Sequence, residues 1–186
     1  MTDFSLQGHF LLSMQKLNGS YFGQTLILLC EHNPDGALGL ILNKSTDVAL
    51  TEMLAELDLV ASADVDAESR KVFEGGPVAQ DRGFVVHEQA LTSTDCLQLA
   101  DSLYISGATA ALTELLTNPD CGNFHVLLGY AGWGAGQLEE ELKDNSWLTV
   151  EAQSSVVFDT PNSDKLLAAA AQLGIDYRLL ADAGYA

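Results

Sequence analysis

Positive charge is scarce in this chain. Only 8 residues are Lys or Arg, against 26 Asp or Glu, so the formal net charge is −18 at pH 7. Binding to nucleic acid at physiological salt depends on basic groups that displace counterions from phosphates. The eight basic side chains are scattered along the sequence, with no dense basic segment. We therefore expect no direct binding to DNA or RNA by this chain alone.

Cysteine and long apolar runs are scarce as well. Cys30, Cys96 and Cys121 form no Cys-X-X-Cys pair, and an odd count without that motif fits a reducing compartment better than a disulfide framework. No apolar run approaches the ~18 residues that cross a bilayer. The first residues show no basic stretch followed by an apolar one. These absences predict a cytoplasmic protein that does not enter the membrane.

What is present indicates a folded domain. Apolar residues make up 47% of the chain and charged residues 18%, a balance typical of globular proteins. At 186 residues the chain has the length of one domain and needs no metal or disulfide for stability. We expect residues 1–186 to form a single domain.

Apolar patterns predict strands and helices with no regular alternation. Strands are expected at residues 9–14, 24–31, 37–43, 72–74, 83–88, 96–99, 124–128, 147–150 and 156–158. Helices are expected at residues 48–57, capped by Ser45 or Thr46, at 109–116, at 137–142, and from Pro161, capped by Thr160, to about residue 173. The turn residues 33–36 predict a hairpin. The order indicates an α+β fold with a mixed or largely antiparallel sheet.

Residues 129–136 combine four glycines with Tyr130 and Trp133, and an acidic helix follows. Glycines before a helix can cradle an anion, but the segment lacks the lysine of a phosphate-binding loop. Acidic residues 139–141 would also repel phosphate. Backbone geometry that returns the aromatic side chains to the core is the alternative. Trp133 is either a core anchor or an exposed centre of a binding surface.

Cys30 and His32 are the strongest candidates for chemistry. On a regular strand they point to the same face, and an imidazole beside a thiol can generate a nucleophile. A buried cysteine at the end of an apolar strand is the simpler explanation. The four histidines have no spacing typical of metal ligands, so we expect neither a metal nor another cofactor.

The motifs taken in order resemble those of the YqgE/AlgH family of bacterial proteins. They are Gly8-His9-Phe10-Leu11-Leu12-Ser13-Met14, Cys30-Glu31-His32-Asn33, Gly36-Ala37-Leu38-Gly39-Leu40, Asn43-Lys44, Gly75-Gly76-Pro77-Val78, Asp81-Arg82-Gly83-Phe84-Val85-Val86-His87, Leu128-Gly129-Tyr130-Ala131-Gly132-Trp133, Gly136-Gln137-Leu138-Glu139 with Glu141-Leu142, Trp147, Thr160-Pro161 and Gly184-Tyr185-Ala186. The resemblance covers nearly the whole chain.

The resemblance implies a cytosolic bacterial protein with one α+β domain. Its sheet is expected to curl into a partly closed pseudo-barrel flanked by helices. One branch of the family has been named as a transcriptional regulator of exopolysaccharide synthesis, but the family has no agreed activity or cofactor. This chain departs from the family pattern at Gln15 and Ser45, where proline is usual, around residues 105–108, and at Tyr185, where relatives have histidine.

Three functions remain open from the sequence. The first is a non-catalytic interaction or regulatory module that binds a protein partner or a small ligand. Its candidate binding residues are His32, Asn33, Asn43, Lys44, Arg82, His87, Tyr130, Trp133 and Gln137. The second is a small-molecule enzyme in which His32 or His87 is the general base and Arg82 or Lys44 holds an anionic substrate. The third, direct nucleic-acid binding, is disfavoured by charge.

Overall fold

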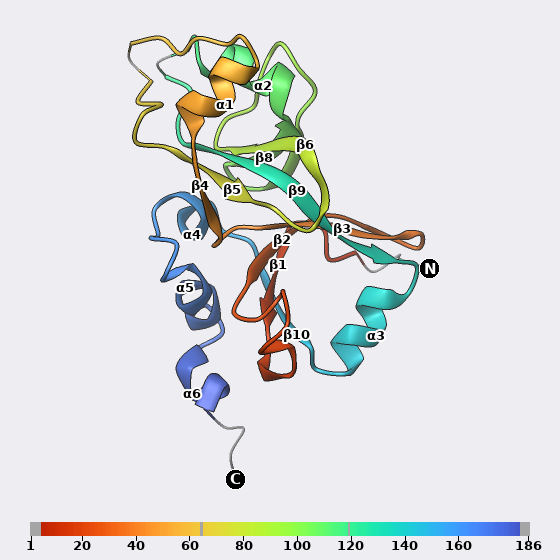
Figure 1. Ribbon diagram of the computed structural model, residues 1–186. Helices are drawn as coiled ribbons and strands as arrows, with labels where there is room; N and C mark the ends of the chain where they lie inside the picture. The colour runs from red at the N-terminus through yellow and green to blue at the C-terminus, as the bar shows by residue number, and fades with distance from the viewer. Residues whose placement is uncertain (1–4, 64, 119, 183–186) are drawn as a thin grey trace.

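Ten strands join in one sheet in the computed structural model, which describes residues 5–63, 65–118 and 120–182 (Figure 1). The strands are β1 (His9–Ser13), β2 (Leu26–Asn33), β3 (Gly36–Ile41), β4 (Ser45–Ala49), β5 (Lys71–Glu74), β6 (Val78–His87), β7 (Leu97–Ala100), β8 (Leu103–Gly107), β9 (Phe124–Gly134) and β10 (Trp147–Glu151). The helices are α1 (Leu50–Glu56), α2 (Ala108–Leu115), α3 (Gln137–Lys143), α4 (Ser154–Phe158), α5 (Lys165–Ala171) and α6 (Tyr177–Asp182), with a 3-10 turn at Gln15–Leu17.

The sheet runs in the order β10-β1-β2-β3-β9-β6-β8-β7, and β4 and β5 branch from β9. Only the β5–β9 pairing is parallel among the pairings of the described strands. The sheet curls so far that β7, at one end of the order, meets the residues before β1. A side-chain carbon at Gly8 would lie 2.2 Å from the Leu99 carbonyl oxygen. The expected α+β fold with a curled, largely antiparallel sheet is confirmed.

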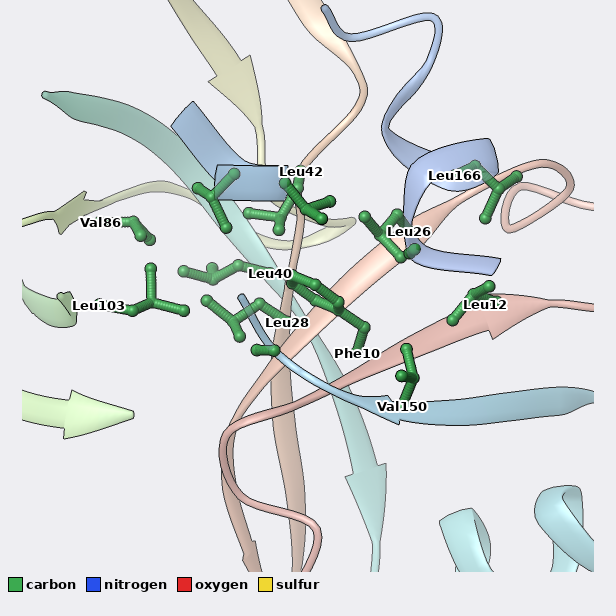
Figure 2. Packing of buried hydrophobic residues seen from close by; sticks show 14 of the residues in the cluster. Phe10, Leu12, Leu26, Leu28, Leu40, Leu42, Val86, Leu103, Val150 and Leu166 are labelled. Atoms are coloured by element: carbon green, nitrogen blue, oxygen red, sulfur yellow. The ribbon is translucent and has the colours of Figure 1, made fainter. Parts of the chain in front are cut away.

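Successive side chains of the central strands point to opposite faces of the sheet and belong to separate apolar clusters there. On one face, side chains from β1, β2, β3, β6 and β8 meet Leu166 of α5 and Val150 of β10 (Figure 2). The other face divides in two. Leu11, Ile27 and Leu29 pack with Trp133 beside α3, while α1 and α2 cover a third cluster that contains Phe124. Figure 1 shows α1 and α2 at one end of the sheet and α3 at the other.

The glycine-rich segment is part of a strand. Strand β9 continues through Gly134 and pairs with β3 from Gly39↔Ala131 to Gly36↔Gly134. Gly129 has a φ of +76°, and a side-chain carbon there would lie 2.3 Å from the Gly76 carbonyl oxygen. Close backbone approach at a left-handed residue requires glycine. The geometry therefore favours the backbone interpretation of these glycines over an anion-binding loop.

Most predicted elements are confirmed, including the hairpin in which Asn33 pairs with Gly36. Residues 156–158 are an exception, because they belong to α4, where Val156 and Val157 are buried. The β-branched residues favour strands in isolation, but tertiary packing overrides that preference. Strands β4 and β8 and helix α6 were not predicted.

The predicted helix caps were also wrong. Ser45 and Thr46 lie in β4, where the Thr46 hydroxyl donates to the Val72 carbonyl, and α1 begins after Ala49. The Thr160 hydroxyl donates backward to the Ser155 carbonyl, and α5 begins only at Lys165. The Thr46 oxygen accepts the Val48 N–H within β4, and the N-cap positions of α1 and α5 are Ala49 and Asp164, so neither Thr46 nor Thr160 stands where a helix begins.

Candidate functional site

Glu141 on α3 ties that helix to the sheet. Its carboxylate accepts the indole N–H of Trp133 at 2.9 Å, the indole N–H of Trp147 at 2.8 Å and the side-chain amide of Gln137 at 2.9 Å. The Gln137 oxygen in turn accepts the backbone N–H of Gly134. The two indoles pack edge to face, and Trp133 is only 7% exposed. Trp133 is therefore a core anchor and not an exposed aromatic side chain.

His32 joins the same end of the molecule to the N-terminal segment. Its Nδ1 accepts the backbone N–H of Leu6 at 2.9 Å, so Nε2 carries the ring proton and donates to the Glu139 carboxylate at 3.1 Å. The Glu139 pKa is lowered, mainly by a backbone hydrogen bond within its own residue and then by His32. With both nitrogens engaged in a buried ring, His32 is poorly placed to act as a general base.

Asn33, Asn43 and Lys44 bond to turns. The Asn33 side chain accepts the Asp35 N–H. Asn43 accepts the Leu26 N–H and donates to the Gln24 carbonyl. The Lys44 ammonium donates to the Tyr21 carbonyl at 2.6 Å and lies 4.1 Å from the centre of the Tyr21 ring.

His87 is fully buried in β6. Its Nδ1 lies 2.7 Å from the Gln89 carbonyl, so this nitrogen is protonated, and Nε2 accepts from the Ser106 hydroxyl at 3.0 Å. Burial lowers the His87 pKa, which keeps the ring neutral at pH 7. The bonded pair resembles a serine and its base. Ser106 is 5% exposed and lines a surface cavity beside Arg82, whereas the His87 ring is fully buried.

Cys30 and His32 do not share a face. The β2–β3 register shifts between Leu29 and Glu31, so Cys30 is the additional residue of a β-bulge,. The thiol enters the same apolar cluster as Phe10, whereas His32 bonds to Leu6 on the other side. Burial raises the pKa of the Cys30 thiol. A thiol–imidazole pair is therefore excluded for these two residues.

Arg82 and Tyr130 meet at Phe84. The guanidinium lies 5.1 Å from the centre of the Phe84 ring, and Tyr130 packs edge-on against that ring. Arg82 and Phe84 border a surface cavity of about 330 Å³, the Arg82 hollow, whose floor contains Leu38, Phe84 and Ile105. Of the nine candidate residues, Arg82 lines this hollow and Tyr130 supports it from Phe84. Trp133, Gln137 and His32 gather at α3. His87 lies behind the hollow, where it bonds to the lining residue Ser106.

The rim of the Arg82 hollow is charged and partly apolar. Exposed Glu31, Arg82 and Asp95 surround it, with Leu97 at 43% exposure. Cys30 and Cys96 also line it. Sequence reasoning missed every rim residue except Arg82. The bulge that turns Glu31 to this side has no local sequence signal, and β8 was not predicted.

The sequence also did not predict a second surface cavity, the basic hollow. Its volume is about 300 Å³, and its lining includes Arg70, Lys71, His125 and Asn162 over the rings of Phe73 and Phe124. Arg70-Lys71 is the only adjacent pair of basic residues in the chain, and that signal could have drawn attention to it. Over the described ranges, no group of three or more His, Cys, Asp or Glu side chains is placed to hold a metal ion.

The curled sheet and the flanking short helices place the protein in the α+β class. The profile of the AlgH-like family matches residues 10–178, and the chain belongs to that family. It is 39% identical to a UPF0301 protein of Vibrio parahaemolyticus, covering 98% of this chain and 100% of the relative. It is 40% identical to a UPF0301 protein of Chromobacterium violaceum, with full coverage of both.

Solved structures agree with this assignment. The solution structure of the AlgH protein from Pseudomonas aeruginosa has a TM-score of 0.78 at 40% identity and covers 100% of both chains. A crystal structure of a protein from Corynebacterium diphtheriae has a TM-score of 0.74 at 22% identity, covering 97% of this chain and 94% of that one, and supports the fold alone. None of the helices in the described part is long and apolar enough to span a membrane.

Proposed function

We propose that this protein is a non-catalytic recognition module and that the Arg82 hollow is its binding site for a protein partner. The observation that carries the proposal is the combination of an apolar floor with an exposed, charged rim in one cavity. Energetically important contacts in protein interfaces cluster where an apolar anchor fills a pocket surrounded by polar groups. The two candidate bases, His32 and His87, give the enzyme alternative no comparable support, because both rings are buried and fully bonded.

The chemistry of the rim points to one kind of partner. Glu31 and Asp95 place two carboxylates beside the floor, and the net charge of −18 attracts basic surfaces over a longer range,. A volume of about 330 Å³ accommodates one or two side chains. We therefore infer a partner that inserts an apolar side chain flanked by basic residues, with Arg82 and Leu97 contacting the aliphatic part of the inserted segment.

A selection from a random peptide library on the immobilised protein tests this proposal. Enriched peptides are expected to carry an apolar residue next to Lys or Arg. Their dissociation constants are then measured with the wild type, Leu97→Asp and Arg82→Ala. Leu173→Asp is the matched control, because Leu173 is 41% exposed and does not line the hollow.

We expect both hollow variants to weaken binding at least tenfold, since a buried anchor contact contributes about 1–2 kcal/mol or more, and we expect Leu173→Asp to bind as the wild type does. Equal affinity of Leu97→Asp, Arg82→Ala and Leu173→Asp would reject the Arg82 hollow as the binding site.

A further inference from the structure

The basic hollow concentrates positive charge in a strongly acidic protein. Among the residues that the structure describes, Arg70 and Lys71 line it and no Asp or Glu does, although the chain has 26 acidic residues and 8 basic ones. Strand β5 supplies Lys71, β9 supplies His125, and Asn162 comes from the segment before α5. Residues that are far apart in the sequence thus converge on one cavity.

Arg70 is held in place without a carboxylate. Its Nη1 donates to the Phe124 carbonyl at 3.0 Å, and its guanidinium lies 4.4 Å from the centre of the Phe124 ring. Among the residues that the structure describes, the ion pairs are Lys16–Asp144 and His32–Glu139, so Arg70 and Lys71 take part in none. The charge of Arg70 acts weakly on Asp66, whose pKa is lowered mainly by hydrogen bonds from Ser69. The remaining guanidinium donors are therefore available to a ligand.

A buried ammonium lies behind the same cavity. Lys165 is 1% exposed, and its Nζ donates to the Leu42 carbonyl at 3.2 Å and lies 5.0 Å from the centre of the Phe73 ring. Phe73 lines the basic hollow and packs against His125, with ring centres 4.7 Å apart. One carbonyl satisfies only one of the three donors of an ammonium group. An uncompensated buried charge is costly, and an anion nearby would offset that cost.

The field of Lys165 reaches the lining of the hollow. The His125 pKa is lowered to about 4, first by burial and next by the charge of Lys165. Because His125 Nε2 lies 3.1 Å from the Val157 carbonyl, that nitrogen carries the ring proton. The ring is neutral at pH 7, so the positive charge offered to a ligand by the lining comes from Arg70 and Lys71.

We propose that the basic hollow binds a small phosphate monoester, with the phosphate on Arg70 and Lys71 and an apolar or aromatic portion against Phe73 and Phe124. A guanidinium binds phosphate oxygens through two parallel hydrogen bonds. The volume of about 300 Å³ is at the lower end for small-molecule sites. This site is separate from the Arg82 hollow, so either proposal can fail while the other holds.

The test is a titration followed by NMR, with ionic strength kept constant. Inorganic phosphate, phenyl phosphate and uncharged phenol are added to the wild type, Arg70→Gln, Lys71→Gln and Arg178→Gln. Arg178 is exposed and does not line the basic hollow, so its variant controls for the loss of one positive charge. Lys71 is exposed, so Lys71→Gln provides a variant that keeps the fold even where Arg70→Gln does not.

We expect saturable shifts of the His125 ring and of the amides of β5 with both phosphates. Phenyl phosphate should bind more tightly than inorganic phosphate, and phenol should bind weakly. Lys71→Gln and Arg70→Gln should each weaken phenyl phosphate binding about tenfold or more, because a hydrogen bond to a charged group is being removed, while Arg178→Gln should not. Shifts that do not saturate, or equal dissociation constants for Lys71→Gln and Arg178→Gln, would overturn the proposal.

Discussion

Replacement of Glu141 by alanine tests whether one carboxylate fastens α3 to the sheet. The side chain accepts two indole N–H groups and one amide. Trp133 and Trp147 are 7% and 4% exposed, so in Glu141→Ala both indole donors lose their partner inside a packed cluster. Water can reach the half-buried position of Glu141 and replace part of the lost bonding.

The magnitude follows from the number of bonds. Hydrogen bonds to a charged group contribute roughly 1.5–3 kcal/mol each, and loss of an acceptor leaves a buried donor unsatisfied. With two indole donors affected and partial compensation by water, we expect the free energy of unfolding to fall by about 2–4 kcal/mol. Glu141→Gln retains an oxygen acceptor without the charge and should lose about half as much.

Urea denaturation followed by far-UV circular dichroism measures this free energy without depending on tryptophan fluorescence. The control is Glu140→Ala. Glu140 lies on the same helix, is exposed and gains the same helix propensity on replacement, so its effect should stay within about 0.5 kcal/mol. If Glu141→Ala and Glu140→Ala had the same stability, the Glu141 network would contribute nothing and the account of α3 would be wrong.

Three further results are expected. Burial lowers the Lys165 pKa from 10.5 to about 8. Between these pH values the unfolded chain binds more protons than the folded chain, so the free energy of unfolding rises with pH by up to about 3 kcal/mol. In denaturation curves from pH 7 to 11, Lys165→Met should lack this rise, and an identical pH dependence in both proteins would refute the assignment. Gly129→Ala should destabilise the fold by about 3 kcal/mol or more, because the φ of Gly129 is +76° and the new side-chain carbon would lie 2.3 Å from a carbonyl oxygen,. Gly134→Ala, whose new carbon would have its nearest atom beyond the adjacent residues at 3.9 Å, should cost about 1 kcal/mol or less. Similar thermal midpoints of the two variants would contradict this expectation. In native thiol labelling followed by peptide mass spectrometry, partly exposed Cys96 should react first, and Cys30, with its raised pKa and 2% exposure, should react only on unfolding; rapid native labelling of Cys30 would contradict its burial.

The elements that sequence predicted well are those whose burial follows local periodicity. Strand β2 and the Asn33–Gly36 hairpin have apolar and turn signals within a few residues of each other,. Helix α4 was mistaken for a strand because Val156 and Val157 favour strands, while the packing that makes the segment helical comes from distant residues,. Strand β8 was missed although Leu103, Tyr104 and Ile105 favour strands and alternate in burial,.

The candidate site was harder to predict than the fold. The sequence left Trp133 open between a core anchor and an exposed binding residue, and its burial favours the anchor. Its partner Glu141 was not among the candidates, since nothing in the sequence places that carboxylate opposite two indoles. The bulge at Cys30 separates it from His32, and a one-residue bulge reverses the face of every later side chain. Arg70 and Lys71 approach His125 and Asn162 only through the branch of β5 from β9.

The central proposal is that this AlgH-like protein acts by recognition through the Arg82 hollow. Its most direct test is quantitative affinity capture from bacterial cells that express the tagged wild type, Leu97→Asp or Leu173→Asp, followed by binding measurements on the purified pair. We predict at least one protein that is captured by the wild type and Leu173→Asp, is lost with Leu97→Asp, and binds the purified wild type at least tenfold more tightly than the purified Leu97→Asp variant. The same set of partners for all three proteins, with equal affinities, would contradict the proposal.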